Sequence, residues 1–404
     1  MKAVMYGGGN IGRGFIGALF SQSGYEVVFV DVNEQVVSAL SKEQRYPVRF
    51  ISNEKYEDIW IEGVTAVHGN DSEAVGNAIA ECDIMATAVG SRALEYIVPN
   101  IVNGLRRRWT KTETPFNIII CENLLHADKI LRKLIKDKLS VEEQALFDDS
   151  VGLVEASIGR MVPVQTPEMQ DGNPLRVCVE KYGFLPTDKA AFKGPIPKIK
   201  NMVPFEPFDF YIKRKLYVHN MGHASCAYLG NYLSLDYIYE AINVADIRII
   251  VQNAMQDSAM ALSEKYNMQL NPVILHVQDL LFRFNNAALA DTCKRVGGDP
   301  ERKLSAEDRM IGAAHLSLEQ GILPAYIAVG IAAGVRSLIE ERPELEQSEE
   351  VAIQILLQVS GLKQDDLLTK LIVDMYRLFL DGKALAEIRT IADKVKAAGL
   401  QAII

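Results

Sequence analysis

A glycine cluster near the beginning of the chain constrains the fold more than any other feature. An apolar run at positions 3–6 leads directly into the segment Gly7-Gly8-Gly9-Asn10-Ile11-Gly12. A second apolar run at 27–30 follows and ends on Asp31. This order of strand, G-x-G-x-x-G turn, helix, strand and acid predicts a unit that binds a dinucleotide at the end of its first strand.

Each part of the glycine cluster has a physical role in such a unit. Gly7 permits the tight turn, Gly9 lets the backbone approach a pyrophosphate, and Gly12 lets the helix pack close to the strand. Asn10 and Ile11 begin the predicted helix, whose free N–H groups and partial positive charge attract phosphates. We therefore expect these five residues to contact the cofactor.

Asp31 bears on which dinucleotide binds. Its carboxylate accepts hydrogen bonds from the ribose hydroxyls and repels a 2′-phosphate. The next residues, Val32 and Asn33, offer no cation to hold such a phosphate. The sequence therefore predicts NAD, rather than NADP, as the cofactor.

Composition and charge exclude several classes of protein. With 404 residues, the chain is long enough for two domains, and its net charge of −9 argues against nucleic acid as a partner. The five cysteines are scattered and form no C-x-x-C pair, which is typical of reduced thiols in a cytoplasmic protein. No apolar run reaches membrane-spanning length, so we expect no membrane partner.

Strands and helices alternate in the first half of the chain, whereas helical periodicity dominates the second half. Further strands are predicted at 84–88, 117–121, 152–157 and 175–180, and a proline-rich stretch at 194–208 is interpreted as a link. We predict an α/β N-terminal Rossmann-type domain at 1–195 and a mostly α-helical C-terminal domain at 196–404. The small residues Ala88 and Val89 end one predicted strand, where they either let a cofactor lie across it or form a simple loop.

One segment of the second half carries an unusual set of polar residues. On a regular α-helix, Lys215, His219, His223 and Asn220 fall within roughly 140° of one another on one side. The residues that follow, 224–229, are mostly small and apolar, so this helix is expected to be buried. A buried helix face with Lys, His and Asn indicates a special role, because unpaired polar groups are costly there.

Metal-free oxidation of an alcohol is one role that suits this helix face. A lysine whose pKa is lowered by burial can act as general base, and an asparagine can donate to the oxygen that gains charge. Two simpler roles stay open on these residues alone. Lys215 can extend to solvent while His223 is an ordinary core histidine. Alternatively, His219 and His223, at i and i+4, can bind zinc, although no carboxylate or cysteine lies at ligand spacing beside them.

The spacing Lys215-x4-Asn220-x2-His223 resembles the K-x4-N-x2-H motif of the polyol-specific long-chain dehydrogenases, the mannitol dehydrogenase family. That resemblance spans most of the chain and implies an NAD domain followed by a helical domain. The patterns most similar to members acting on mannitol 1-phosphate are GGGNIGRGFIG at 7–17, TAVG at 87–90, CENLL at 121–125, KLYVHNMGHA at 215–224 and RKLSAEDR at 302–309.

The resemblance implies a role for each catalytic candidate. Lys215 matches the general base, and Asn220 and Asn123 match the two asparagines that stabilise the oxyanion. His223 matches the histidine that binds the reacting hydroxyl or carbonyl region. Without the family, Asn123 is interpreted as an ordinary loop asparagine.

Two positions depart from the family pattern. Gly159 stands where members carry an aspartate before an arginine, and Lys213 stands close to where members carry a glutamate before the lysine. No proton-channel role that depends on that glutamate is therefore carried over to this chain.

A cationic loop is the candidate for holding a phosphate. Arg295, Arg302 and Lys303 flank the Gly297-Gly298 turn, and paired N–H donors of arginine suit a phosphate. Nearby acids almost balance these charges, so charge alone also fits a solvent-exposed loop. The family resemblance favours a substrate-facing Arg295, with Arg302 and Lys303 assisting.

The resemblance implies NAD-dependent, metal-independent interconversion of D-mannitol 1-phosphate and D-fructose 6-phosphate. Two alternatives remain. The first is an unphosphorylated polyol such as mannitol or arabinitol, or a uronate-derived keto acid, handled by the same lysine. The second is an NAD(H)-sensing protein without turnover, which leaves Lys215, Asn220 and His223 without a role. The expected partner is a small sugar phosphate, and the sequence does not determine the oligomeric state.

Overall fold

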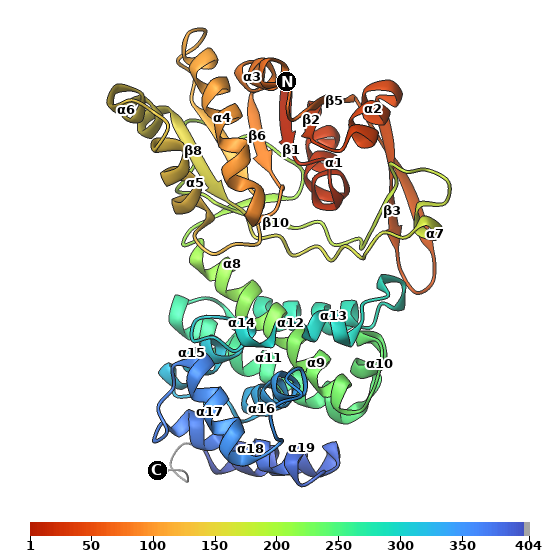
Figure 1. Ribbon diagram of the computed structural model, residues 1–404, viewed down its shortest axis with the longest axis vertical. Coiled ribbons are helices and arrows are strands. Elements are labelled where there is room, and N and C mark those ends of the chain that lie inside the picture. The colour runs from red at the N-terminus through yellow and green to blue at the C-terminus, as the bar shows by residue number, and fades with distance from the viewer. Residues whose placement is uncertain (400–404) are drawn as a thin grey trace. The chain divides into compact units, whose positions relative to one another are not determined.

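The apolar segments of the first half form a six-stranded parallel sheet in the computed structural model, which describes residues 1–399 (Figure 1). Its strand order is β5-β2-β1-β6-β7-β8. The strands run parallel throughout, so their carboxyl ends lie at one edge of the sheet. Their bounds are β1 Lys2–Tyr6, β2 Glu26–Asp31, β5 Val64–His68, β6 Ile84–Thr87, β7 Phe116–Ile120 and β8 Val151–Glu155.

Helices cover both faces of this sheet. In β1, Ala3 and Met5 belong to one hydrophobic cluster, whereas Val4 and Tyr6 belong to the other, because successive side chains point to opposite faces. The first cluster includes residues of η1 (Gly12–Ile16), α1 (Gly17–Gln22) and α2 (Glu34–Glu43). The second includes residues of α3 (Ser72–Glu81), α4 (Leu94–Trp109), α5 (Ala127–Lys136) and α6 (Val141–Ser150). The predicted Rossmann-type fold is therefore confirmed.

A smaller sheet packs beside the first cluster. It joins β3 (Arg45–Ile51), β4 (Tyr56–Glu62) and β9 (Val177–Val179), with the short helix α7 (Pro167–Gln170) preceding β9. Strands β3, β4 and β5 were not predicted from the sequence, and the segment predicted as a strand at 175–180 belongs to this smaller sheet. The acidic residues in the YEDIWIE segment explain part of the omission, because Asp and Glu are depleted in strands.

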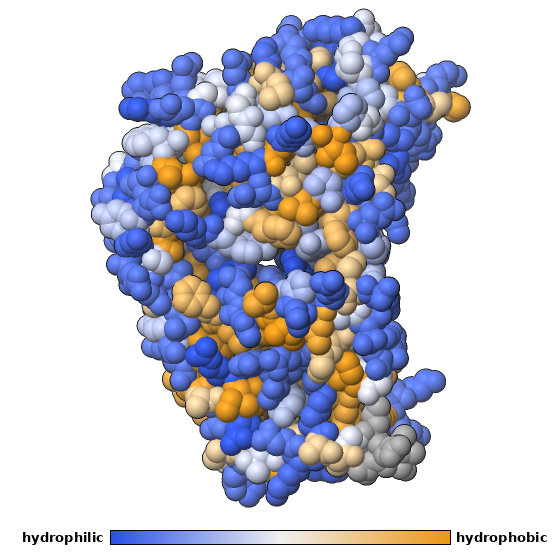
Figure 2. Space-filling model, turned by 180° about the vertical axis from the view of Figure 1, so that it is seen from behind, coloured by the Kyte–Doolittle hydropathy of each residue, from blue (hydrophilic) through white to orange (hydrophobic). Residues whose placement is uncertain are grey.

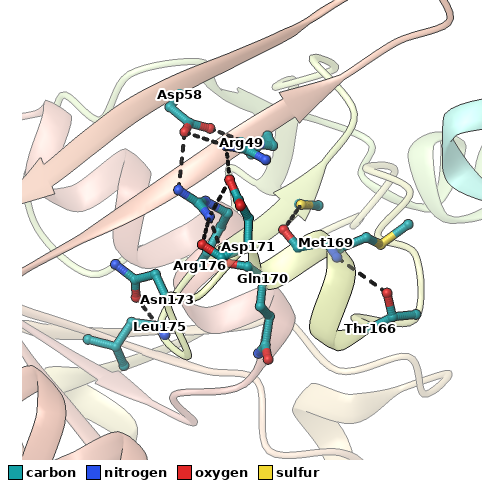
Figure 3. Close-up of polar contacts among 10 residues, drawn as sticks. Arg49, Asp58, Thr166, Met169, Gln170, Asp171, Asn173, Leu175 and Arg176 are labelled. Carbon is teal, nitrogen blue, oxygen red and sulfur yellow. Dashed lines mark hydrogen bonds and ion pairs between the residues drawn. The ribbon is translucent and has the colours of Figure 1, made fainter.

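Two arginines and two aspartates hold the smaller sheet to the turn before β9 (Figure 3). Arg49 pairs with Asp58 at 2.6 Å and with Asp171 at 3.2 Å, and Arg176 reaches the same Asp58 at 3.3 Å. Hydrogen bonding from Arg49 lowers the pKa of the Asp58 carboxyl. This network fixes the neighbouring Leu175, whose carbonyl accepts a hydrogen bond of 2.5 Å from Arg13 in η1, directly after the glycine-rich turn.

The first compact unit ends at Asp209, not at residue 195 as expected. The proline-rich stretch is no linker, because it contains β11 (Met202–Phe205), which pairs in parallel with β10 (Leu185–Asp188). Those backbone hydrogen bonds keep the stretch in the first unit. The second unit begins at Phe210.

The second unit is helical in its described part, apart from one isolated bridge between Tyr237 and Thr292. Helix α9 packs against α11, α13 and α16, and most residues of α16 are buried. The elements are α8 (Asp209–Lys213), η3 (Arg214–Asn220), α9 (Met221–Tyr232), α10 (Ile238–Asn243), α11 (Ala245–Tyr266), α12 (Leu270–Phe284), η4 (Ala287–Leu289), α13 (Cys293–Gly297), α14 (Pro300–Lys303), α15 (Ile311–Glu319), α16 (Ala325–Glu340), α17 (Glu349–Ser360), α18 (Leu367–Leu380) and α19 (Leu385–Ala398).

Surface hydrophobic residues are interspersed with hydrophilic ones on the face drawn in Figure 2. Such scattering is ordinary for a folded chain. Across residues 1–399, none of the helices combines the length and the apolar character needed to cross a membrane. All five cysteines are buried free thiols.

Candidate active site

The glycine-rich turn connects β1 to the helix that follows it, and the structure separates the roles of its glycines. Gly7 has a φ of +107°, and a Cβ there would lie 2.4 Å from the carbonyl oxygen of Ala88. A Cβ at Gly12 would lie 1.9 Å from the carbonyl oxygen of Gly7. At Gly9, by contrast, no atom of the described residues lies within 4 Å of such a Cβ. The protein itself therefore requires Gly7 and Gly12, whereas Gly9 borders open space suited to a ligand.

The helix after the turn begins with exposed Asn10 and partly buried Ile11 and then widens into the π-helix η1. The N–H of Gly17 donates to the carbonyl of Gly12, five residues earlier. Arg13 lies buried in this wide turn and donates to the carbonyl of Gly8 at 2.6 Å. Arg13 thus holds the turn from inside the protein, a role that was not predicted from the sequence.

Asp31 lies at the end of β2 and already holds two backbone groups. One carboxylate oxygen accepts the N–H of Gly8 at 2.6 Å, and the other accepts the N–H of Asn33 at 2.8 Å. A carboxylate has about four acceptor sites, so capacity remains for further hydrogen bonds. Since Asp31 is only partly buried, that capacity is accessible to a ligand.

The loop after β6 is tied to the end of β7 by a glutamate that was not predicted as functional. Glu122 is 7% exposed, and its two oxygens accept the N–H groups of Val89 at 2.9 Å and Gly90 at 2.8 Å. The Ala88 N–H donates to the carbonyl of Tyr6 in β1. The only sequence signal for the Glu122 contact is an acid shortly after the fully apolar end of β7.

Asn123 follows Glu122 and is exposed at the carboxyl end of β7. The loop that carries it leads to α5, where the carboxylate of Glu155 accepts the N–H of Ala127 at 3.0 Å. Burial and nearby Asp128 raise the pKa of Glu155 to about 7. Glu122 and Glu155 therefore hold the loop of Asn123 on both sides.

In the second unit, the lysine-bearing segment is not the regular α-helix that was expected from the sequence. Residues Arg214–Asn220 form the π-helix η3, in which Met221 donates its N–H to the carbonyl of Leu216. A bond between residues i and i+5 marks a wider turn, and such turns occur frequently at functional sites. This wider turn brings Asn220 closer to the side of Lys215 than the roughly 140° of a regular helix, and His223 follows in the first turn of α9.

The surroundings of Lys215 favour its neutral form. Burial, followed by the positive charge of Arg309, lowers the pKa of its ammonium group from 10.5 to about 8. His219 is buried on the same segment, and burial and the charge of Arg283 lower the pKa of this imidazole well below its usual value. A lysine with a pKa near neutrality can both accept and return a proton at ordinary pH.

His223 is held by a stacked aromatic ring and by a carboxylate. Its ring stacks on Phe284, with centroids 4.8 Å apart and planes 12° apart, and Nε2 lies 3.3 Å from a carboxylate oxygen of Asp291. The carboxylate favours the tautomer with a proton on Nε2, so Nδ1 remains an acceptor. Neither contact was predicted, because Phe284 and Asp291 lie far from His223 in the sequence.

The cationic loop is densely paired with acids. Arg295 donates through Nε to Asp291 at 2.8 Å, and Arg302 pairs with Asp299 at 2.6 Å and with Asp308 at 3.0 Å. Both arginine side chains nevertheless remain about half exposed, so an anion can reach them.

Lys303 is buried, in contrast to the two arginines of this loop. Its ammonium group donates to the carbonyls of Val296, at 2.7 Å, and Gly298. Burial, followed by the charge of Arg309, lowers its pKa to about 8. The positive charge of Arg309 also lowers the pKa of Lys215, so the same arginine influences Lys303 in this loop and Lys215.

The two departures from the family pattern have definite surroundings. A Cβ at Gly159 would lie 3.1 Å from a ring carbon of Tyr182, so an aromatic ring occupies the place next to it. Lys213 is partly buried at the end of α8. Among residues 1–399, no group of three or more His, Cys, Asp or Glu side chains is arranged to hold a metal ion.

Two family models match this chain almost end to end. Residues 1–201 match the mannitol dehydrogenase Rossmann domain, and residues 208–382 match the mannitol dehydrogenase C-terminal domain. The chain belongs to the mannitol dehydrogenase family. Its resemblance to that family, inferred from the K-x4-N-x2-H motif, is thereby confirmed.

Similar proteins agree with this membership. A mannitol-1-phosphate 5-dehydrogenase of Oceanobacillus iheyensis is 35% identical over 388 residues, which cover 94% of this chain and 99% of the relative. The chain is also similar to a solved structure of Pseudomonas fluorescens mannitol 2-dehydrogenase in complex with NAD and D-mannitol. The match covers 98% of this chain and 94% of that chain, with a TM-score of 0.74 at 15% identity. A substrate-free D-sorbitol dehydrogenase gives 0.79 over 96% of this chain and 95% of its own, also at 15% identity. At such identities the two structures confirm the fold of this family.

Proposed function

We propose that this mannitol dehydrogenase family oxidoreductase interconverts D-mannitol 1-phosphate and D-fructose 6-phosphate with NAD. Family membership makes it a dehydrogenase and sets aside the NAD(H)-sensing alternative. The substrate rests on the relative named mannitol-1-phosphate 5-dehydrogenase, which is matched over 99% of its length. The observation that carries the chemistry is a partly buried Lys215 with a pKa of about 8, one π-helical turn from Asn220.

The residues of the first unit fit a dinucleotide. Gly9 borders open space, the helix that begins at Asn10 and Ile11 presents free N–H groups, and Asp31 keeps acceptor capacity for the ribose. Ala88 and Val89 form the neighbouring loop. When bound, NADH supplies the hydride, and NAD accepts it in the reverse direction.

Residues of this chain transfer the hydroxyl proton and stabilise the negative charge on the reacting oxygen. In reduction, the Lys215 ammonium gives its proton to the oxygen of the carbonyl that becomes a hydroxyl; in oxidation, the neutral amine takes that proton back. Asn220 and Asn123 donate hydrogen bonds to this oxygen while it carries negative charge. His223, with Nδ1 as acceptor, holds a substrate hydroxyl in register.

Arg295 and Arg302 are assigned to the phosphate, because their side chains are exposed and suit paired contacts with an anion. Lys303 assists by holding the Val296 and Gly298 carbonyls, which shapes the loop between the two arginines. The existing pairing with aspartates favours one other candidate, an unphosphorylated polyol or keto acid, because such a substrate brings no phosphate to replace those partners.

Substrate comparison tests the proposal. Absorbance of NADH is followed with fructose 6-phosphate, fructose and a uronate-derived keto acid, each with and without EDTA, and with NADPH in place of NADH. We expect fast turnover with fructose 6-phosphate and NADH alone, unaffected by EDTA. Faster turnover with fructose or the keto acid would change the assigned substrate and keep the lysine, and loss of activity in EDTA would refute the metal-free mechanism.

Replacement of Glu122 tests the cofactor loop. In Glu122→Gln, one acceptor oxygen becomes an NH₂ group facing a backbone N–H, so a charge-assisted bond worth about 1.5–3 kcal/mol is lost. We expect the Kd for NADH to rise at least about tenfold. Fluorescence titration with NADH measures it, with the exposed Glu95 of α4 as the matched control in Glu95→Gln. An unchanged Kd in Glu122→Gln would show that this glutamate does not position the loop.

A further inference from the structure

Asp291 is a single carboxylate shared between two groups with different proposed roles. One oxygen lies 3.3 Å from Nε2 of His223, and the other accepts two N–H groups of Arg295, through Nε at 2.8 Å. Its side chain is 11% exposed, so little solvent competes for either contact. Hydrogen bonds from His223 and Arg295, together with the positive charge of Arg295, hold the pKa of the Asp291 carboxyl below its usual value, although burial alone would raise it.

The aspartate and the histidine are held firmly, whereas the arginine is not. The Asp291 carbonyl accepts the N–H of Ile238, and Cys293 donates its N–H to the carbonyl of Asp236, so the backbone here is fixed on both sides. His223 stacks on Phe284. The Arg295 side chain is 55% exposed and is the part of the triad that can move toward a ligand.

We propose that Asp291 is a positioning residue that links the phosphate end of the substrate to His223. A bound phosphate dianion draws the Arg295 guanidinium toward itself and leaves Asp291 to His223 alone. The carboxylate then holds the Nε2 proton more strongly, which fixes the tautomer and makes Nδ1 a better acceptor for the substrate hydroxyl. This inference rests on the proposed sugar phosphate reaction. It goes further because the bound phosphate, besides anchoring the substrate, strengthens the Asp291–His223 contact at the reacting end.

The coupling is measured by supplying the two halves of the substrate separately. Fructose lacks the phosphate, and inorganic phosphite provides a free dianion for Arg295. We expect phosphite to raise the slow turnover of fructose by roughly fivefold or more, the lower range of energetic coupling between sites. A contact that serves only to anchor the substrate gives no such activation, because phosphite and fructose are not joined.

Two variants separate the parts of the triad. In Asp291→Asn, phosphite activation is lost and kcat with fructose 6-phosphate falls. In Arg295→Ala, no arginine shares the Asp291 carboxylate with His223. We therefore expect kcat with fructose to rise above that of the unmodified protein without phosphite. KM for fructose 6-phosphate is expected to increase, because a phosphate contact is lost. Lys294→Ala removes an adjacent exposed cation and is expected to keep the activation factor.

The outcomes distinguish this inference from the proposed function. Fast turnover of fructose 6-phosphate without phosphite activation of fructose would keep the function and overturn the coupling. Equal activation in Asp291→Asn and the unmodified protein would also overturn it, as would a drop in fructose turnover in Arg295→Ala. Absence of fructose 6-phosphate turnover would refute the proposed function itself. Melting temperatures check that Asp291→Asn folds, and Arg295→Ala tests the coupling independently of that variant.

Discussion

Lys215→Met is expected to lower kcat for fructose 6-phosphate roughly 10²–10⁴-fold, the contribution typical of general acid–base catalysis. Methionine keeps the length and the apolar stem of the side chain and removes the group that transfers the proton. The substitution leaves every residue of the glycine-rich turn in place, so NADH affinity is expected to stay unchanged. Stopped-flow measurement of NADH oxidation under single-turnover conditions reports the chemical step.

The matched control is Lys265→Met, which removes a lysine of α11 that pairs with Glu319. A surface pair of this kind contributes about 0–1 kcal/mol, so kcat is expected to stay the same. Near-normal single-turnover rates in Lys215→Met would refute the assignment of the lysine as general acid and base.

The same lysine predicts opposite pH profiles for the two directions. Reduction needs the protonated ammonium, so its kcat falls as pH rises through about 8. Oxidation needs the neutral amine, so its kcat rises over the same range and then levels off. Both inflections are expected to disappear in Lys215→Met, and a profile that persists there would belong to another group.

Gly9→Ala and Gly12→Ala are expected to fail in different ways. A Cβ at Gly12 would lie 1.9 Å from a carbonyl oxygen, so Gly12→Ala lowers stability by at least about 1–3 kcal/mol. A Cβ at Gly9 meets no atom of the described residues within 4 Å, so Gly9→Ala keeps the melting temperature. It nevertheless places a methyl group where the pyrophosphate must approach, and we expect the Kd for NADH to rise more than about tenfold.

Calorimetric melting curves and NADH titrations of the two variants check this difference. Gly24→Ala is unsuitable as a control because its φ is +85°, so the unmodified protein serves as the reference. Unchanged NADH affinity in Gly9→Ala would show that the pyrophosphate does not lie over this glycine. A stable Gly12→Ala would contradict the close packing of the turn.

Features that depend on local pattern could be predicted from the sequence. Buried parallel strands show as continuous apolar runs, and the glycine cluster has a fixed order, so five of the six strands of the first sheet and the cofactor turn could be predicted. Helical periodicity likewise indicated a helical second half, and the described part of the second unit is helical apart from one isolated bridge. The catalytic motif came from spacing and from the family resemblance.

Features that depend on contacts across the chain could not be predicted. The π-helix of η3 has no periodicity signal in a single sequence, so the angle between Lys215 and Asn220 was misjudged. Asp291 reaches His223 across 68 positions, and Glu122 reaches Val89 across 33, so neither pair has a local pattern. The domain boundary was placed too early because prolines resemble a linker until the pairing of β11 is known.

Transfer of deuteride from deuterated NADH to the product tests the central claim most directly. The protein is incubated with fructose 6-phosphate and NADH labelled at the reactive position of the nicotinamide, and the product is identified by mass spectrometry. We predict mannitol 1-phosphate with one deuterium at the former keto carbon, formed by the unmodified protein and almost none by Lys215→Met. Unlabelled product, or labelled product only from an unphosphorylated substrate, would contradict the account.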